Sequence, residues 1–185
     1  GNHDYKGITD NKVLYKKLKM PSEYYSFMKK NWVFVFLNTN EIAAYSNVVG
    51  TAKEQELLRI QNQIKVNKEI QGARWNGGVS SRQLQWLDNL LKKSEKKNRN
   101  VLIFCHHPLY PRSQFTALNN MEILDVINRY NCVKAIFSGH HHSGAFGYFD
   151  HIPCNTVEGM IETPDKNSFG IVRIYKDRIE LEGKE

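Results

Sequence analysis

Two apolar runs of strand length, each preceded by a helical pattern and each ending in histidine, are the strongest constraint on the fold. Val101–Cys105 follows a segment with leucines at helical spacing and ends at His106-His107-Pro108. Val133–Phe137 follows the apolar-rich segment Asn120–Tyr130 and ends at Ser138-Gly139-His140. This alternation of helix and strand predicts an α/β fold, with the histidines just beyond the carboxyl ends of the strands.

The rest of the chain supplies further elements around this centre. A serine at position 80 or 81 is expected to cap the leucine-bearing helix, which runs to about Glu95. Trp32–Leu37 reads as a buried strand because its residues are aromatic or β-branched. The remaining expectations are short helical turns or loop at Lys12–Leu18 and Ser22–Lys29, a helix at Glu54–Ile70, strands at Thr156–Ile161, Phe169–Tyr175 and Arg178–Leu181, and a hairpin joining the last two across Lys176-Asp177.

Composition bounds the class of protein. The 185 residues are 41% hydrophobic and 24% charged, which fits a single globular domain, 1–185, with a sizeable core. No apolar run approaches the roughly 18 residues of a membrane span, so no membrane partner is expected. The chain has three cysteines but no CxxC pair, which argues against a cysteine zinc site.

The net charge of +7 leaves nucleic-acid binding as a weaker alternative. Much of the surplus sits between Lys92 and Arg99, at the polar end of the expected helix, and no aromatic-interleaved binding segment accompanies it. We therefore expect a solvated helix face and no nucleic-acid partner. A nucleic-acid-binding domain would instead show affinity that falls steeply with salt.

The histidines gather in clusters. Of seven histidines, six fall at three places, which are His3, His106-His107 and His140-His141-His142. Neutral imidazole is the commonest protein ligand for first-row divalent metals. In an extended segment, residues two apart project to the same side, so His140 and His142 can approach one metal cluster together. With the carbonyl oxygen of Asn2, such a set suits Mn, Fe or Zn better than calcium. His151 has no motif around it and is expected to be structural.

Three ordered segments resemble the calcineurin-like metallophosphoesterases. They are Gly1-Asn2-His3-Asp4, Cys105-His106-His107-Pro108 and Gly139-His140-His141-His142, which match the last three of that family's five blocks. The resemblance implies the C-terminal part of a β-sandwich flanked by helices, a four-layer α/β/β/α fold without its N-terminal strands. It also implies a phosphohydrolase in which two divalent ions activate a hydroxide for attack on phosphorus.

Further segments resemble one branch of that family, the manganese-dependent ADP-ribose/CDP-alcohol diphosphatases. These markers are Trp75-Asn76-Gly77-Gly78-Val79-Ser80, the motif around Pro108-Leu109-Tyr110-Pro111, and Glu158–Thr163 followed by Ser168-Phe169-Gly170. The implied substrate is a small nucleotide diphosphate. A phosphomonoesterase or phosphodiesterase of the same superfamily is the alternative enzyme, because a generic member could share these markers by descent.

The resemblance also implies residue roles. Asn2, His106 and His140 correspond to ligands of one metal, and His142 corresponds to a ligand of the other. His3 would face the phosphate as a general acid or charge stabiliser, and Asp4 would orient His3. Residues with less support as substrate-proximal or second-layer groups are His107, His141, Tyr5, Tyr110 and Tyr148; the tyrosines could stack on a base or ribose, or simply pack.

The family's first two blocks, D-x-H and G-D-x-x-D, have no counterpart in these residues. They would carry two aspartates and a histidine, so we expect this chain alone to be inactive and to hold at most one weakly bound metal. A preceding segment or a separate partner chain would supply them; otherwise the chain is a non-catalytic module that binds metal or phosphate. An exposed sheet edge would favour self-association, and the resemblance weakly favours the cytoplasm.

Overall fold

The computed structural model describes residues 1–162, 165, 168–176 and 178–184. Its helical segments are η1 (Asn2–Tyr5), α1 (Asn11–Lys17), α2 (Lys53–Val66), α3 (Ser81–Lys96), α4 (Asn120–Ile127) and η2 (Met160–Glu162). Its strands are β1 (Tyr25–Lys29), β2 (Trp32–Phe36), β3 (Ile42–Ala43), β4 (Gly77–Gly78), β5 (Asn100–Phe104), β6 (Val133–Ser138), β7 (Ala145–Phe149), β8 (Ile152–Thr156), β9 (Phe169–Ile174) and β10 (Ile179–Lys184). Among the described residues, no helix is long and apolar enough to cross a membrane.

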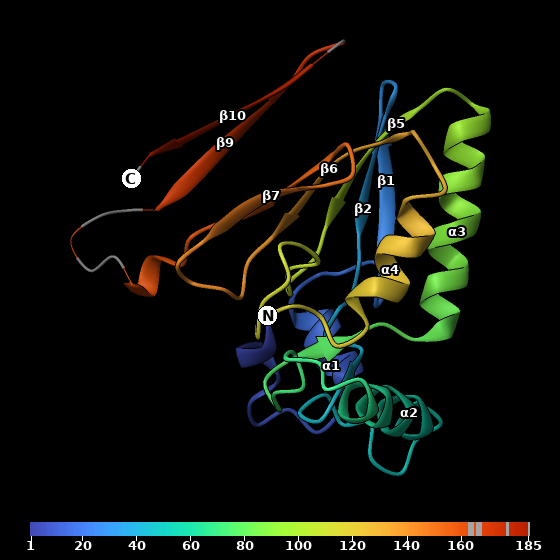
Figure 1. Ribbon diagram of the computed structural model, residues 1–185, viewed down its shortest axis with the longest axis vertical. Helices are drawn as coiled ribbons and strands as arrows, with labels where there is room; N and C mark the ends of the chain where they lie inside the picture. Colours follow the sequence, from blue (N-terminus) through green and yellow to red (C-terminus); the bar gives the residue numbers. More distant parts are fainter. Residues whose placement is uncertain (163–164, 166–167, 177, 185) are drawn as a thin grey trace.

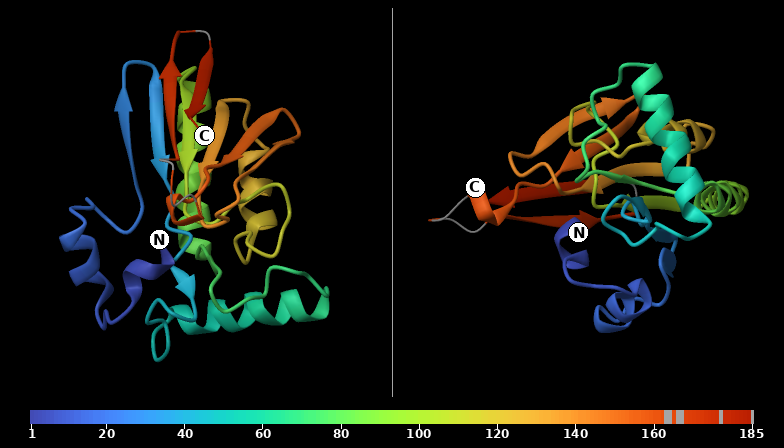
Figure 2. Two further views of the ribbon diagram at one scale, coloured as in Figure 1. Left: turned by 90° about the vertical axis from the view of Figure 1, so that its left-hand side faces the viewer. Right: turned by 90° about the horizontal axis from the view of Figure 1, so that it is seen from below.

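The main sheet has six strands in the order β1-β2-β5-β6-β8-β7. Strands β2, β5, β6 and β8 run parallel to one another. The two edge strands, β1 and β7, are antiparallel to their neighbours. In register, Phe36 at the end of β2 lies opposite Phe104 of β5, which lies opposite Phe137 of β6. The carboxyl ends of these three strands therefore meet at one edge of the sheet. Figure 1 shows the N-terminus, α1 and α2 gathered at that end, and the further views agree (Figure 2).

One face of the sheet is covered by α3 and α4 (Figure 1). The predicted leucine stripe of α3 is confirmed, because Leu87 and Leu91 are fully buried in a core cluster with strand residues such as Ile103. Ser80 caps this helix through its hydroxyl, which accepts a hydrogen bond from the backbone N–H of Gln83 at 3.1 Å. The cap and the stripe together fix where the helix begins and which side it buries.

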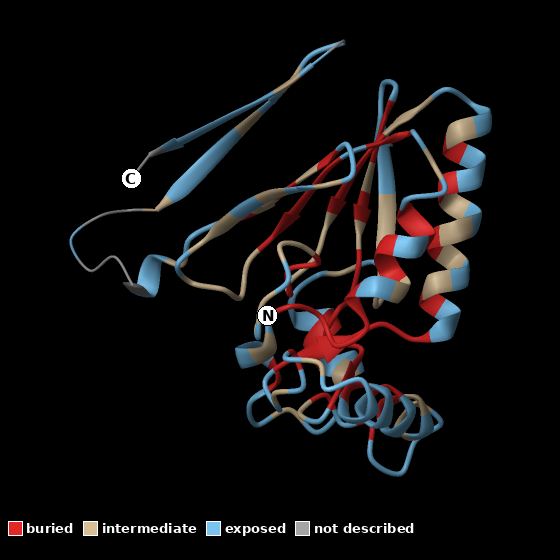
Figure 3. Ribbon diagram, in the orientation of Figure 1, coloured by how far each residue is buried: buried red, intermediate tan, exposed pale blue. Residues whose placement is uncertain are grey.

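The other face of the sheet meets the β9–β10 hairpin. Val172 and Ile174 of β9 pack against a cluster that contains Trp32, Leu102 and Phe137. Helices, main sheet and hairpin thus form successive layers, as the expected sandwich requires. Figure 3 shows that the central strands are largely buried and the hairpin largely exposed. The predicted hairpin is confirmed by the antiparallel pairing of β9 and β10, while Asp177 and Thr163 lie outside the described residues.

Two local expectations were wrong, and two strands of the main sheet were not predicted. Part of Ser22–Lys29 forms β1 because its aromatic residues stack across the strand pair, Tyr25 on Phe36 and Phe27 on Phe34, each at 4.8 Å between ring centroids. The strand expected at Thr156–Ile161 ends at Thr156 and is followed by η2. Strand β7 and most of β8 were not predicted, since Gly147 and Pro153 weaken the local strand signal.

Candidate metal centre

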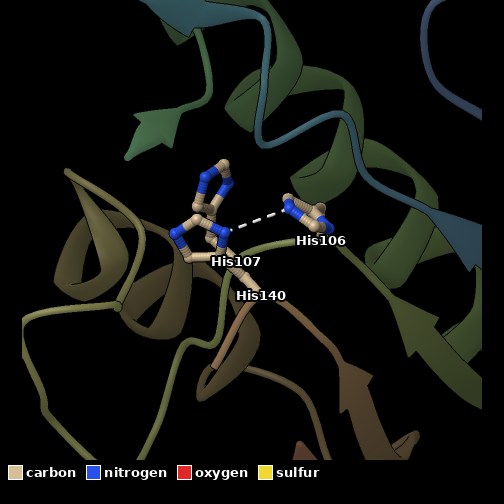
Figure 4. A group of neighbouring side chains, drawn as sticks. All are labelled: His106, His107 and His140. Atoms are coloured by element: carbon tan, nitrogen blue, oxygen red, sulfur yellow. Dashed lines mark hydrogen bonds between the residues drawn. The ribbon is translucent and has the colours of Figure 1, made fainter. Parts of the chain in front are cut away.

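Two strand ends and one N-terminal turn build the candidate centre. His106 and His107 follow β5 after Cys105, and His140 follows β6 after a single glycine. Figure 4 shows the three imidazoles facing one another from these two strand ends, and their ligand atoms all lie within 4.8 Å of one another. Asn2 of η1 approaches the same point. The parallel register of the strands therefore creates the cluster, as expected for functional groups at this edge of an α/β sheet.

Two possible metal-binding atoms lie beside Nε2 of His106, which is the third. Its Nε2 lies 3.0 Å from Oδ1 of Asn2 and 3.1 Å from Nδ1 of His140. Ligand atoms about 2.1 Å from one ion and separated by 90° are about 3.0 Å apart, which is the spacing found here. The donors are two imidazoles and one amide oxygen, a set that fits a first-row divalent metal. These residues therefore fit the ion that the sequence predicts.

Burial keeps the cluster in the form that binds metal. Burial lowers the pKa of His106 to about 3 and that of His140 to about 4, and neighbouring positive charges act in the same direction. Both rings are therefore neutral near pH 7, as ligation requires. His140 also has a φ of 65°, a left-handed conformation that is uncommon outside glycine and is concentrated at functional sites.

His107 lies behind the other two rings and is fully buried. Its Nδ1 is 2.9 Å from the hydroxyl of Thr39, and its Nε2 is 3.3 Å both from the hydroxyl of Tyr45 and from the carbonyl oxygen of Trp75. Both ring nitrogens thus have protein partners. This arrangement makes His107 a brace between the segment after β2 and the turn at Trp75, and leaves it no exposed surface to offer a substrate.

His3 and His142 lie at the margin of the cluster. Burial is the largest cause of the lowered pKa of His140, and positive charge on His142 or His3 lowers this pKa further. Both rings therefore lie close to His140. The ring of His142 rests against Gly159, where an added β-carbon would lie 3.1 Å from its Cδ2 atom. Asp4 contacts the backbone nitrogen of Gly1 and makes no hydrogen bond to His3 in the described structure. The roles inferred for these residues stay predictions.

The remaining predicted residues make other contacts, and two of them, Tyr148 and His151, are exposed. His141 stacks on Phe115 at 4.6 Å between ring centroids. Tyr5 is buried, with its hydroxyl 3.3 Å from that of Tyr15. The last three are Tyr110, which packs on Phe149, Tyr148, which lines a groove under the β9–β10 hairpin, and His151, which pairs with Asp150 in the β7–β8 turn.

Sequence reasoning assigned no role to Thr39 and Tyr45, which contact His107, or to Asn76, which contacts His140. Oδ1 of Asn76 lies 3.0 Å from Nε2 of His140. In the sequence, Asn76 stands out only as part of a family marker. The two glycines after Asn76 are the feature of the sequence that could have indicated a closely packed turn here. A β-carbon at Gly77 would lie 2.3 Å from the carbonyl oxygen of Thr39, and one at Gly78 would lie 2.4 Å from Oδ1 of Asn119.

Comparison with known proteins agrees with this geometry. A family model described as calcineurin-like phosphoesterase matches residues 1–144. Manganese-dependent ADP-ribose/CDP-alcohol diphosphatases of Bos taurus and of Oryza sativa subsp. japonica are each 31% identical over 100% of this chain, which spans 64% of each relative's length. A crystal structure of a dimetal phosphatase from Danio rerio superposes with a TM-score of 0.87 and 27% identity, over 99% of this chain and 67% of that one. The chain belongs to the calcineurin-like phosphoesterase family.

Proposed function

We propose that the protein containing these 185 residues is a metal-dependent phosphohydrolase that cleaves the diphosphate link of small nucleotide-like molecules, of the ADP-ribose or CDP-alcohol class. The observation that carries this proposal is the convergence of Asn2, His106 and His140 on one point. Family membership and the names of the relatives support it. The metal we propose is manganese, which the relatives' names specify and which suits a mixed nitrogen and oxygen donor set.

Each residue has a distinct task in this proposal. Asn2 Oδ1, His106 Nε2 and His140 Nδ1 hold one ion, and His142 contributes to the holding of a second. When bound, a pair of divalent ions supplies positive charge that stabilises the transition state of phosphoryl transfer. His3 is exposed beside Asn2, where its ring can donate a proton to the departing oxygen or stabilise the charge on it.

An open surface pocket beside His3 favours a substrate larger than a simple phosphate ester. Its volume is about 580 Å³, within the range of small-molecule sites. The wall carries the cations Lys6 and Arg74 and the half-exposed indole of Trp75, together with Asn2. Two cations and an aromatic ring suit a second phosphate and a planar base. This composition favours a diphosphate of nucleotide type over the alternatives within the superfamily, a phosphomonoester or a simple phosphodiester.

The test is a substrate comparison with the complete protein and Mn²⁺. ADP-ribose and a CDP-alcohol would be compared with p-nitrophenyl phosphate and bis(p-nitrophenyl) phosphate, and products identified by anion-exchange chromatography. We expect the highest kcat/KM with the diphosphates and release of a nucleoside monophosphate. His106→Ala should remove the activity, whereas Arg82→Ala, at an exposed position of α3 outside the cluster, should not. A preference for the p-nitrophenyl esters would contradict the proposed substrate class.

A further inference from the structure

The side chain of Asn76 is held in one orientation by two backbone carbonyls. Asn76 is 1% exposed and lies in the turn that leads into β4. Its Nδ2 donates to the carbonyl oxygen of Gln71 at 2.8 Å and to that of Gln114 at 2.7 Å. Both partners are acceptors only, so a flipped amide would set its oxygen against two other oxygens. The amide nitrogen must therefore face these carbonyls.

This orientation determines which atom of Asn76 meets His140. With Nδ2 committed, Oδ1 is the atom 3.0 Å from Nε2 of His140. An amide oxygen is an acceptor only, so Nε2 of His140 must carry the hydrogen. A neutral imidazole has a single ring hydrogen, and Nδ1 is then left with its lone pair. That lone pair points at Nε2 of His106, 3.1 Å away, which is where the donor atoms converge.

We infer that Asn76 is a positioning residue that fixes the Nε2–H tautomer of His140 and so directs its Nδ1 at the metal. This inference rests on the metal centre of the proposed function and adds a residue to it. Asn76 contacts the ligand and not the metal, so it acts through His140. Partners of this kind, which accept the distal N–H of a ligating histidine, set ring orientation and raise ligand basicity.

The surrounding turn is built to hold Asn76 in place. The carbonyl of Trp75, one residue earlier, lies 3.3 Å from Nε2 of the fully buried His107. One residue later, Gly77 approaches the carbonyl oxygen of Thr39 so closely that a β-carbon would clash at 2.3 Å. Asn76 is thus clamped between His107, which follows β5, and the segment after β2. A residue with only a packing role would need neither the double carbonyl anchor nor the contact with His140.

The first experiment reads the tautomer directly in the complete, metal-free protein. Histidine labelled with ¹⁵N and long-range ¹H–¹⁵N correlation spectra distinguish Nε2–H from Nδ1–H rings, and the signals of His140 are assigned by their loss in His140→Gln. We expect His140 in the Nε2–H form. An Nδ1–H ring for His140 would overturn the inference without any change to Asn76.

The second experiment separates positioning from folding. Asn76→Leu and Asn76→Asp both remove the two donated hydrogen bonds, but only the aspartate keeps an oxygen that can accept from His140. We expect Mn²⁺ affinity, measured by calorimetry, to fall about 10–100-fold in Asn76→Leu and by less in Asn76→Asp, whose second carboxylate oxygen is set against the two carbonyls but whose first still accepts from His140. Asn120→Leu is the matched control, because Asn120 is equally buried and donates to the carbonyl of Leu109 at 3.1 Å without touching the cluster.

The outcomes are distinct. Equal Mn²⁺ affinity of Asn76→Leu and Asn76→Asp, or an equal loss in Asn120→Leu, would make Asn76 a packing residue and overturn the inference. If Asn76→Leu does not fold, the tautomer of His140 in the unaltered protein decides. If the tautomer and the affinities are as expected but no diphosphate is hydrolysed, the proposed function fails while the role of Asn76 at the metal stands.

Discussion

Glu41 offers a sharp test of how the segment behind the metal centre is held. Its side chain is 2% exposed and follows β2 by a few residues. The carboxylate accepts hydrogen bonds from the N–H and the hydroxyl of Ser80 at 3.0 and 2.9 Å and from Nε2 of Gln83 at 2.6 Å. It also pairs with Nζ of Lys53 at 2.9 Å. One carboxylate thus ties the start of α3 and the start of α2 to the end of β2.

Glu41→Ala leaves all of these donors without their acceptor. Removal of one partner from a buried ion pair costs about 3–5 kcal/mol. Lys53 is one-third exposed and keeps Glu23 at 2.7 Å, so we take the lower end, about 3 kcal/mol. For a chain of this size, each kcal/mol lowers the melting temperature by about 2–4 °C. The expected loss is therefore about 6–12 °C.

Urea unfolding of the complete protein would measure the loss of about 3 kcal/mol, and the accompanying fall in melting temperature would be smaller in a longer chain than the figure for 185 residues. Glu54→Ala is the control, because Glu54 is in the same helix as Lys53 but accepts a single bond, from the N–H of Gly50 at 3.0 Å. Glu41→Gln keeps an acceptor for Ser80 and loses the charge, so it should fall between the two. If Glu41→Ala is destabilised by no more than about 0.5 kcal/mol beyond Glu54→Ala, the carboxylate does not hold these elements together.

Three further results are expected. Treatment with EDTA should abolish hydrolysis, and Mn²⁺ should restore it; activity that survives chelation would refute a metal mechanism. His140→Ala should weaken Mn²⁺ binding in calorimetry by at least about 100-fold, because it removes a donor atom outright, whereas Tyr148→Ala, in a separate groove, should leave it unchanged. Because the folded-state pKa values of His106 and His140 are about 3 and 4, against about 6.5 when unfolded, the unfolded chain binds more protons below pH 6.5. The free energy of unfolding of the metal-free protein should therefore fall by about 1.4 kcal/mol per pH unit for each ring as the pH drops from about 6.5 toward 4. Urea midpoints that do not change over this pH range would contradict the burial of the rings.

The sequence predicted the elements that create the cluster because their signals are local. The run Val101–Cys105 became β5 within one residue at each end, and Val133–Phe137 became β6 with one added residue. Apolar composition, the helical spacing of apolar residues and residues that interrupt helices or strands suffice to predict such elements. Parallel strands then bring their carboxyl ends to one edge without further information. The convergence of His106 and His140 followed from topology, once the histidines were read as strand-end residues.

The missed strands show where local signals fail. Strand β1 has exposed residues at Phe27 and Met28 and gains its stability from stacking on β2, a contact that only the hairpin creates. Strand β7 contains Gly147, which approaches the ring of Tyr110 so closely that a β-carbon would lie 3.0 Å from it. In both cases the partner, rather than the segment itself, determines the strand.

The orientation of the donor atoms was beyond sequence reasoning for a related reason. The ring of His140 is set by Asn76, which lies 64 residues away along the chain, and Asn76 is itself set by carbonyls 5 and 38 residues away. No periodicity links such positions, and backbone carbonyls carry no residue-type signal. Topology therefore determines that imidazoles meet at this edge of the sheet. The hydrogen bonds of loop residues determine which ring nitrogen each imidazole directs at the metal. A metal centre needs both, and for that reason the short turn around Asn76, rather than the strands, is where we expect single substitutions to alter metal affinity while the fold persists.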